Sequence, residues 1–361
     1  MEKKKYLIIY HKEDADGLVS AAIIYNYILN KLHKGDKETA TIETLGTTYI
    51  ELSNMINQCG VSNKGMIVDV LYKKYDYIFM TDISFNESEV MKLLYNKFKD
   101  SFVWIDHHFP IIYTSTKEGF DTIPGKRDTR TSAIGLSYIY CYGDDMFKQL
   151  EEQINEIPVL FKQLAGYDSF NWDFHGCTFE ECYNVNKGFE YLTKLDLDII
   201  IEKVKYILSL NNKDDITFNN KLYMLKNVYY DKGKEIAEYE YEYWNNIIKT
   251  SGDDTFTIDG KYGPERKTLV LVMQGKTCST YFKSLIDTDI RNVAVFKRVP
   301  NPQNDKTWNV SVYNIRREDD KEFHVGMYLK KRYKFAGGHS GAAGASISNI
   351  QFNKIFKTHK I

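Results

Sequence analysis

Three apolar, strand-like runs of this sequence are each followed by acidic or histidine side chains, and this pattern constrains the chain most. The runs are "YLIIY", "YDYIFM" and "SFVWI", a composition typical of strands buried on both faces of a parallel sheet. The side chains that follow are His11, Asp14 and Asp16, then Asp82, and then Asp106, His107 and His108. Because ligand sites of open α/β sheets lie beyond the carboxyl ends of the strands, we expect these side chains to converge. So many carboxylates in one crevice are costly unless cations neutralise them.

Helical patterns separate the strand-like runs in the first part of the chain. Residues 18–34 have apolar positions at helical spacing and end in a basic turn before Gly35, and residues 87–99 form a second such segment. Residues 130–143 and 157–170 are two more predicted helices, and Asp168 lies near the end of the last one. Alternating strands and helices predict an α/β domain with a mainly parallel sheet, which we place over residues 1–185.

The remaining sequence predicts two further parts. Residues 186–262 have mixed charge and helical periodicity, which predicts a helical connector. Residues 263–361 return to strand-like runs, among them "KTLVLVMQG" and "NVAVFKRV", before the glycine-rich segment "GGHSGAAG". We therefore expect a smaller second α/β domain over residues 263–361.

Composition and cysteine usage restrict the function classes. The 361 residues carry a formal net charge of -1, so a bulk polycation that binds long duplexes is not favoured. Five scattered cysteines without a CxxC pair are typical of reduced thiols in a cytoplasmic protein. His175, Cys177 and Cys182 are close enough to suggest a zinc clip, but a fourth ligand is missing, and loop thiols are the favoured interpretation. No apolar stretch approaches the ~18 residues of a membrane span.

The clustered residue types suit a two-metal site. Asp14 and Asp16 alternate along a turn that Gly17 allows to bend, so each carboxylate could face a different ion, with His11 on the first. Asp82 would bridge both ions, and two further side chains would complete the ligand set of the second ion: His107 and Asp168. Two divalent cations ~3.5–4 Å apart activate water for in-line displacement at phosphorus. Mn²⁺ suits this mixed carboxylate and imidazole set better than Ca²⁺, with Mg²⁺ as the alternative.

The neighbouring residues of the third run have supporting roles in this hypothesis. Asp106 would hold an imidazole in its correct tautomer. His108 would touch the scissile phosphate or protonate the leaving group. Each motif has a plainer interpretation: "DADG" as a solvated turn, "HH" as a surface pair, the glycine-rich segment as tight packing, and Asp168 as a helix-end turn. Their joint occurrence at predicted strand ends favours the metal site.

In this order, "HKEDADG", "TDIS", "IDHH", "AGYD" and "GGHSGAAG" resemble the DHH/DHHA1 phosphoesterase family, which includes RecJ-like enzymes, nano-RNases and cyclic-dinucleotide phosphodiesterases. The resemblance implies a DHH domain, a DHHA1 domain and an active site in the cleft between them. It also implies the metal ligands His11, Asp14, Asp16, Asp82, His107 and Asp168. His108 would lie near the phosphate, and the substrate would be held by Gly337, Gly338 and His339.

The function expected on these grounds is a Mn²⁺-dependent phosphodiesterase of the nano-RNase type, with Asp82 and His108 as catalytic residues. It would release 5′-mononucleotides from short single-stranded RNA or DNA. The alternatives are hydrolysis of a cyclic dinucleotide or of 3′-phosphoadenosine-5′-phosphate, a RecJ-like single-strand exonuclease, and a non-catalytic nucleotide-binding protein. The expected partners are oligonucleotides or small nucleotides and no membrane, with a homodimer left open.

Overall fold

The structure is a computed structural model in which two compact units are distinguished, Met1–Ala237 and Glu238–Ile361. It describes residues 3–58, 64–85, 88–108, 112, 122–143, 148–210, 216–250, 255–258, 266–273, 277, 279–285, 288–299, 307–315, 325–333, 336–338 and 341–359. The units divide the chain within the segment predicted as a helical connector. Among the described helices, none combines the length and the apolar character that a membrane span requires.

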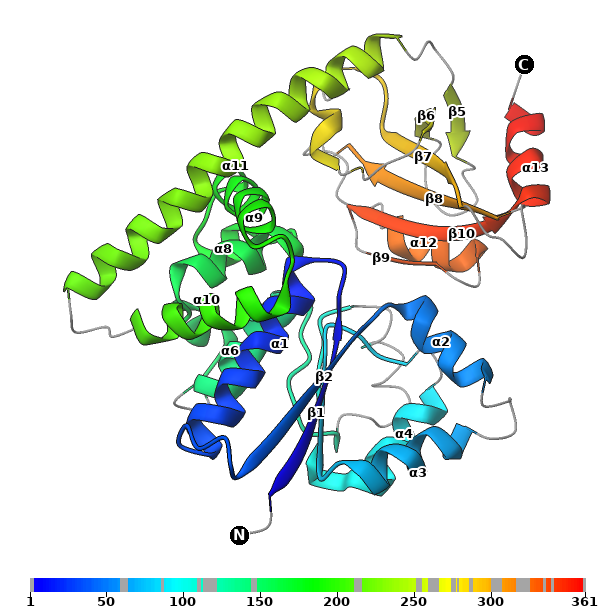
Figure 1. Ribbon diagram of the computed structural model, residues 1–361. Coiled ribbons are helices and arrows are strands. Elements are labelled where there is room, and N and C mark those ends of the chain that lie inside the picture. Colours follow the sequence, from blue (N-terminus) through cyan, green and yellow to red (C-terminus); the bar gives the residue numbers. More distant parts are fainter. Residues whose placement is uncertain are drawn as a thin grey trace. The chain divides into compact units, whose positions relative to one another are not determined.

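A four-stranded parallel sheet forms the centre of the first unit (Figure 1). Its strands are β1 (Lys4–His11), β2 (Ala40–Thr47), β3 (Tyr77–Thr81) and β4 (Phe102–Ile105), in the order β2-β1-β3-β4. All three strand pairs are parallel. The predicted fold class, α/β with a mainly parallel sheet, is therefore confirmed for this unit.

Successive side chains of each strand point to opposite sides of the sheet. Apolar side chains therefore lie on both faces, and helices cover both of them. Ile8 of β1 belongs to a core that includes the helices α1 (Ala15–Tyr27), α6 (Ala133–Tyr142) and α8 (Val159–Asp168). Ile9 belongs to the core on the opposite face, with α2 (Tyr49–Gln58), α3 (Lys64–Lys74) and α4 (Ser88–Phe98). Both side chains are essentially inaccessible to solvent, as a strand buried on both faces requires.

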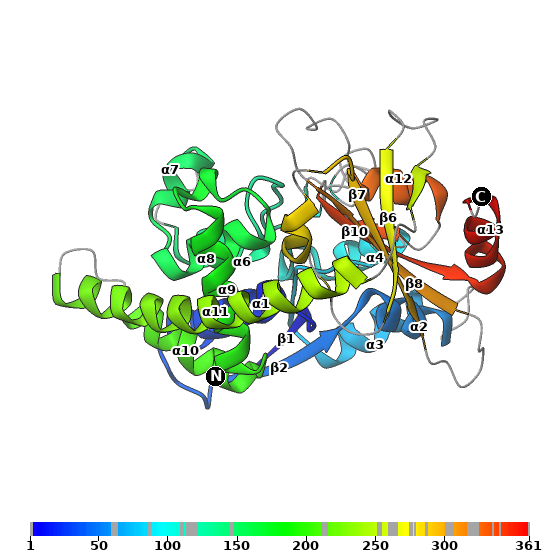
Figure 2. The ribbon, with the colours of Figure 1, turned by 90° about the horizontal axis from the view of Figure 1, so that it is seen from above.

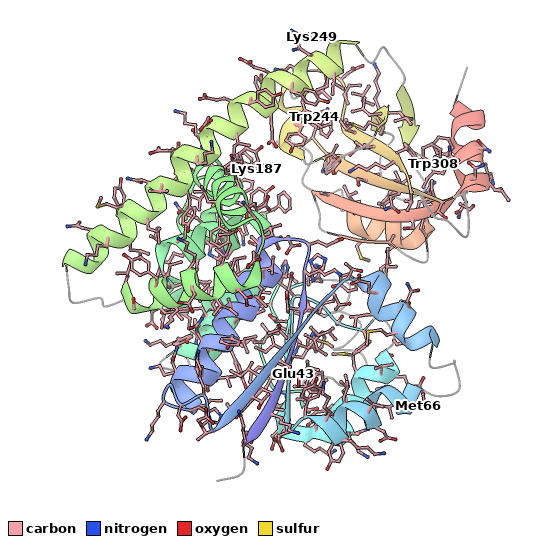
Figure 3. The ribbon with its side chains drawn as sticks, in the orientation of Figure 1. Glu43, Met66, Lys187, Trp244, Lys249 and Trp308 are labelled. Carbon is pink, nitrogen blue, oxygen red and sulfur yellow. The ribbon has the colours of Figure 1, made fainter. Side chains whose placement is uncertain are left out.

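Additional helices complete the first unit: α7 (Leu150–Asn155), α9 (Phe179–Thr193), α10 (Leu197–Leu210) and part of α11 (Ile216–Thr250). Figures 1 and 2 show α11 as one long, continuous helix. Tyr229 of this helix packs into the core of the first unit. Trp244, labelled in Figure 3, packs into a core of the second unit. The helix thus contributes to both units.

The second unit has a six-stranded mixed sheet with the order β5-β6-β7-β8-β10-β9. The strands are β5 (Thr255–Ile258), β6 (Arg266–Val272), β7 (Asn292–Arg298), β8 (Thr307–Asn314), β9 (Ala336–Gly338) and β10 (Ala342–Ser348). The helices α12 (Val325–Arg332) and α13 (Asn349–His359) follow β8 and β10 in the chain. The predicted second α/β domain is therefore confirmed in its class. Gly337 and Gly338 lie in β9, whereas His339 lies outside the described residues.

The segment between the first two predicted strands contains structure that the sequence patterns did not indicate. β2, α2 and α3 all lie there, and β2 is an edge strand whose side chains are mostly half-buried. A half-buried edge strand lacks the continuous apolar run that marks an interior strand, so its sequence signal is weak. The helix predicted to start at residue 18 in fact begins at Ala15.

Candidate metal centre

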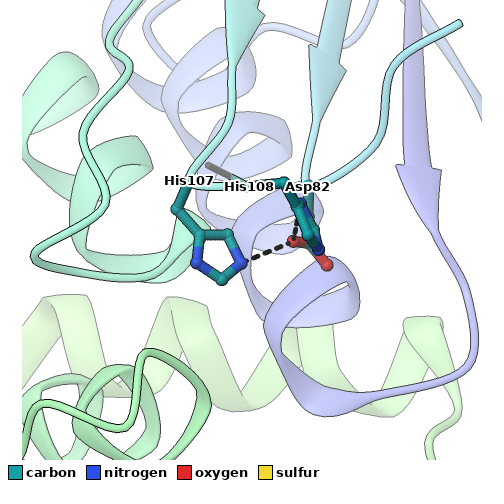
Figure 4. A group of neighbouring side chains, drawn as sticks. All are labelled: Asp82, His107 and His108. Carbon is teal, nitrogen blue, oxygen red and sulfur yellow. Dashed lines mark ion pairs between the residues drawn. The ribbon is translucent and has the colours of Figure 1, made fainter. Parts of the chain in front are cut away.

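The predicted strand ends meet at one edge of the sheet of the first unit. Tyr10, Thr81 and Ile105 are aligned across β1, β3 and β4. The residues that follow them are His11, Asp82 and Asp106, so the parallel register brings three distant segments together. Figure 4 shows Asp82 beside the two histidines that follow β4. The sheet thus produces the convergence that the sequence predicts.

Asp82 makes the turn out of β3 in an unusual backbone conformation. Its φ is +57°, in the left-handed region that a non-glycine residue rarely adopts but that Asp tolerates. Its N–H donates to the carbonyl oxygen of Ile105 over 3.0 Å, so β4 holds the turn in place. The residue is only 2% exposed. Backbone pairing therefore fixes this carboxylate at the edge of the sheet.

The "DADG" segment is the start of α1 and not a flexible turn. Asp14 is the N-cap and accepts a hydrogen bond from the N–H of Gly17 over 3.1 Å. Asp16 already lies in the first helical turn. A Cβ at Gly17 would lie 1.9 Å from the carbonyl oxygen of His11, so the glycine is needed because β1 passes so close. The prediction that Gly17 serves to bend a turn is wrong in this respect.

Asp16 is held by the N-terminus of another helix. Its carboxylate accepts hydrogen bonds from the hydroxyl of Ser132 at 2.5 Å and from the N–H groups of Ala133 and Ile134 at 2.9 Å each. Ser132 is the N-cap of α6, where unpaired N–H groups and the helix dipole favour an anion. The sequence patterns did not indicate this support. The available signal was Ser132 directly before an apolar helix, but its partner lies 116 residues away.

Three groups of side chains in the described residues have ligand atoms within 4.8 Å of one another. The first contains His11, Asp14 and Asp82, the second Asp16, His107 and Asp168, and the third Asp82, His107 and His108. Asp82 and His107 each belong to two groups, so the three overlap. The structure thus brings together all six metal ligands that the sequence predicts, and the seventh predicted site residue, His108, joins them.

His107 lies between three carboxylates. Its Nε2 atom is 3.1 Å from Oδ2 of Asp168, 3.2 Å from Oδ1 of Asp82 and 3.4 Å from Oδ2 of Asp16. Because one ring nitrogen carries at most one proton, it cannot donate to all three carboxylates at once. Oδ1 of Asp82 is buried and accepts no well-directed hydrogen bond in the described part of the chain. This surplus of buried negative charge fits divalent cations.

The pKa shifts follow from the same crowding. Burial raises the pKa of Asp16, and the charges of Asp82 and Asp168 raise it further. Burial alone would lower the pKa of His11, but the carboxylates of Asp14 and Asp82 raise it to about 11. Burial likewise opposes protonation of His107, yet its carboxylate neighbours raise its pKa well above the ordinary value. Without metal, imidazolium groups therefore balance part of the carboxylate charge.

His108 is oriented by the residue two positions earlier. Its Nδ1 lies 2.8 Å from Oδ1 of Asp106, and its backbone N–H donates to the same oxygen over 3.1 Å. Asp106 is fully buried, and its other oxygen accepts from the indole of Trp104. This arrangement favours the tautomer with hydrogen on Nδ1, which leaves Nε2 as the atom to meet a substrate. The imidazole that Asp106 was predicted to orient is therefore that of His108.

Tyr49, the first residue of α2, also borders the site. Its hydroxyl lies 3.5 Å from Nδ1 of His108, and the two rings meet edge to face. Its ring centroid is 6.2 Å from that of His11. Sequence analysis missed Tyr49, because 28 tyrosines are spread through the chain and nothing adjacent in the sequence distinguishes this one.

The zinc clip considered for His175, Cys177 and Cys182 does not form a metal-ligand group. Within the described ranges, these side chains belong to none of the groups with mutually close ligand atoms. His175 is buried, and burial lowers its pKa to about 4 with a contribution from the charge of Lys162. Among the described residues of the first unit, the groups that could hold a metal ion therefore all lie at the edge of its sheet.

The fold and this cluster define a class: an α/β protein with a candidate two-metal centre of carboxylates and imidazoles at the carboxyl ends of parallel strands. The sequence matches no protein-family model and no curated protein. Solved structures are similar in fold. RecJ from Thermus thermophilus, in complex with Mn²⁺, is 13% identical with a TM-score of 0.43, over 99% of this chain and 51% of that chain.

Two other solved structures are similar along the whole chain. A pGpG-specific phosphodiesterase from Vibrio cholerae is 10% identical with a TM-score of 0.38, over 99% of this chain and 97% of that one. The DHH domain of a member of a ribosomal-protein family is 11% identical with a TM-score of 0.44, over 99% of this chain and 85% of that one. RecJ and DHH domains are the kinds of protein that the sequence motifs resemble. At these identities and TM-scores, the likeness assigns no activity to this chain.

Proposed function

We propose that this protein is a metal-dependent phosphodiesterase of the DHH/DHHA1 type. The observation that carries the proposal is the overlap of three ligand groups through Asp82 and His107, with His108 beside them. Acidic clusters alone are common on protein surfaces. Here Asp16, Asp82 and His107 are buried. Asp16 belongs to α1, Asp82 follows β3, and His107 follows β4.

The ligand groups suggest how the side chains would be divided between two cations. His11, Asp14 and Asp82 would hold one ion, and Asp16, Asp82, His107 and Asp168 the other. When bound, such a pair supplies an activated water and neutralises charge on a phosphate group. Mixed carboxylate and imidazole ligands favour Mn²⁺, with Mg²⁺ as the alternative.

The remaining groups position the substrate and move a proton. His108, oriented by Asp106, would place Nε2 near the scissile phosphate, and when both of its ring nitrogens carry a proton it would donate the one on Nε2 to the leaving oxygen. The N-terminus of α6 holds Asp16 through three hydrogen bonds, so this carboxylate needs no rearrangement when a metal binds. Gly337, Gly338 and His339 of the second unit would hold a terminal phosphate or nucleotide.

We infer that the substrates are short single-stranded RNA or DNA oligonucleotides, from which 5′-mononucleotides are released. The net charge of -1 supports short substrates, because a long strand needs an extended basic groove. Cyclic dinucleotides, 3′-phosphoadenosine-5′-phosphate and long single strands are the substrates that would be compared with them.

A substrate panel tests the proposal. A labelled dinucleotide, a long single strand, a cyclic dinucleotide and 3′-phosphoadenosine-5′-phosphate are incubated separately with Mn²⁺ or Mg²⁺, and products are separated by chromatography. We expect the dinucleotide to be cleaved fastest to 5′-mononucleotides. Faster digestion of the long strand, or cleavage of only one of the small nucleotides, would contradict the substrate assignment.

Substitution of Asp82 tests the mechanism separately. We expect Asp82→Ala to lose hydrolysis and bound metal, measured by elemental mass spectrometry. The matched control is Asp100→Ala, which removes an exposed carboxylate outside the three ligand groups and should change neither. Unchanged hydrolysis in Asp82→Ala would refute the proposed metal centre.

A further inference from the structure

Two cysteines meet at the N-terminus of α9. Thr178 is the N-cap of this helix and forms a capping box with Glu181. Cys177 directly precedes the cap, and Cys182 lies one turn into the helix, the two positions whose side chains meet in a hydrophobic staple. Here each thiol influences the other, and the Cys177 thiol also donates to the carbonyl oxygen of His175 over 3.5 Å. The two side chains are therefore already neighbours in the reduced protein.

The two thiols differ in exposure and acidity. Cys177 is half-buried, whereas Cys182 is fully buried. The interaction with Cys182 lowers the pKa of Cys177 against the effects of burial and of the Glu181 charge, and the charges of Lys162 and Lys226 add to the lowering. The interaction with Cys177 and burial raise the pKa of Cys182. An accessible, more acidic thiol beside a protected one is the arrangement of an attacking and a resolving cysteine.

We propose that Cys177 and Cys182 are a reversible, peroxide-sensitive dithiol. The Cys177 thiolate attacks one oxygen of hydrogen peroxide and the O–O bond breaks; the leaving hydroxide takes up the proton that the Cys177 thiol had released, so that a sulfenic acid and water result. The Cys182 thiol then attacks the sulfenic sulfur, so that an S–S bond forms, the S–O bond breaks and a second water leaves. The two thiols thus lose two electrons and two protons to the peroxide, and a dithiol reductant returns them.

Disulfide formation would act on the metal centre through α8. Sγ of Cys182 lies 3.0 Å from the position that a Cβ would take on Gly166, so α9 and α8 are in close contact at this point. An S–S bond of ~2.05 Å is shorter than the separation of two unbonded thiols, so its formation moves the sulfur atoms, and any movement of Cys182 changes its contact with Gly166. Two residues beyond Gly166, Asp168 ends α8 with its carboxylate 3.1 Å from His107. We therefore expect oxidation to loosen the position of Asp168.

Mass spectrometry of the full chain tests the dithiol. Treatment with stoichiometric hydrogen peroxide should remove two hydrogen atoms from the intact mass, and dithiothreitol should restore them. A protease that cleaves after glutamate cuts at Glu180 and Glu181, between the two cysteines. The separated peptides should remain joined only in the oxidised sample. Alkylation of both thiols after peroxide treatment would overturn the proposal.

Serine variants assign the two roles and provide the control. Cys182→Ser should stop at a sulfenic acid on Cys177 that dimedone traps, and Cys177→Ser should leave Cys182 reduced. Cys141→Ser removes another buried thiol and should oxidise like the wild type. Circular dichroism verifies the fold of each variant. Oxidation of Cys182 in Cys177→Ser at the wild-type rate would contradict the attacking role of Cys177.

The coupling to Asp168 rests on the proposed function, because it presumes a metal at that carboxylate. We expect the disulfide form to retain less Mn²⁺ than the reduced form after equilibrium dialysis, and reduction to restore it. Equal retention would overturn the coupling. Should the reduced chain bind no Mn²⁺ at all, the proposed function would fail, while the joined peptides would still establish the dithiol.

Discussion

Metal binding should displace protons from the histidines of the site, and the extent can be worked out for His11. Carboxylate neighbours raise its pKa to about 11, so near pH ~8 the imidazole of the metal-free chain is almost fully protonated. A metal ion binds only the neutral imidazole. At ~1.4 kcal/mol per pH unit, removing this proton about 3 units below its pKa costs up to ~4 kcal/mol. Mn²⁺ affinity should therefore rise about tenfold per pH unit for each proton displaced.

Titration calorimetry in buffers of different ionisation enthalpy measures the number of protons released. We expect His11 and His107 to release about one proton each in the wild type, because both have raised pKa values. His11→Gln should release about one fewer. The control is His33→Gln, since His33 hydrogen-bonds Tyr6 and Thr39 instead of a carboxylate. Equal proton release from wild type and His11→Gln would refute the reasoning.

The metal-free chain should show the opposite pH dependence. A raised histidine pKa contributes stability that is complete below the ordinary pKa near ~6.5 and is lost as the pH rises toward the folded value. For His11 that window extends to about 11. Chelator-treated protein should therefore unfold at lower denaturant concentration as the pH rises through this range, and His11→Gln should show a shallower loss.

Substitutions at three residues test the supports of the site. Gly17→Ala places a Cβ 1.9 Å from the last carbonyl oxygen of β1 and should destabilise the fold by ~3 kcal/mol or more, measured by chemical denaturation; a loss below ~1 kcal/mol would contradict the close approach. Ser132→Ala removes the hydroxyl that donates to Asp16 and should lower the free energy of unfolding by ~1–3 kcal/mol. It should also weaken Mn²⁺ binding ~10–100-fold, and Mn²⁺ affinity equal to that of the wild type would argue against this support. Tyr49→Phe removes a hydroxyl 3.5 Å from Nδ1 of His108, at the limit of a hydrogen bond, and should lower hydrolysis less than ~10-fold. Tyr49→Ala also removes the ring and should lower it more; equal effects of the two variants would show that ring contact is unimportant.

Residues at the ends of strands that are buried on both faces could be predicted from the sequence. A strand buried on both faces has a continuous apolar run, and its end is marked where polar residues begin. His11, Asp82 and His107 were located in this way, and the parallel topology implied that they share one edge. Asp168, near the end of a predicted helix, was expected to complete the ligand set of the second ion, and the resemblance of "AGYD" to a family motif implies the same role; the structure places its carboxylate against His107.

Residues that reach the site from weakly patterned segments could not be predicted. Tyr49 follows the edge strand β2, whose half-buried side chains lack an apolar run. Ser132 contacts Asp16 across 116 residues of sequence, and no local pattern encodes such a pairing. The need for Gly17 also depends on the path of β1, because its own backbone is ordinary helix. The cap that joins Cys177 to Cys182 is local, but the contact of Cys182 with Gly166 is not.

The sequence by itself determined which chemical groups this protein offers and on which kind of element each lies, because hydrophobic periodicity and residue type are local properties. The tertiary structure decided which groups share charge and which are held rigid, because these depend on strand register and on helix packing between distant segments. Asp82 illustrates both: its place after a strand was evident from the letters, whereas its contacts with three histidines arise only when β1, β3 and β4 are aligned.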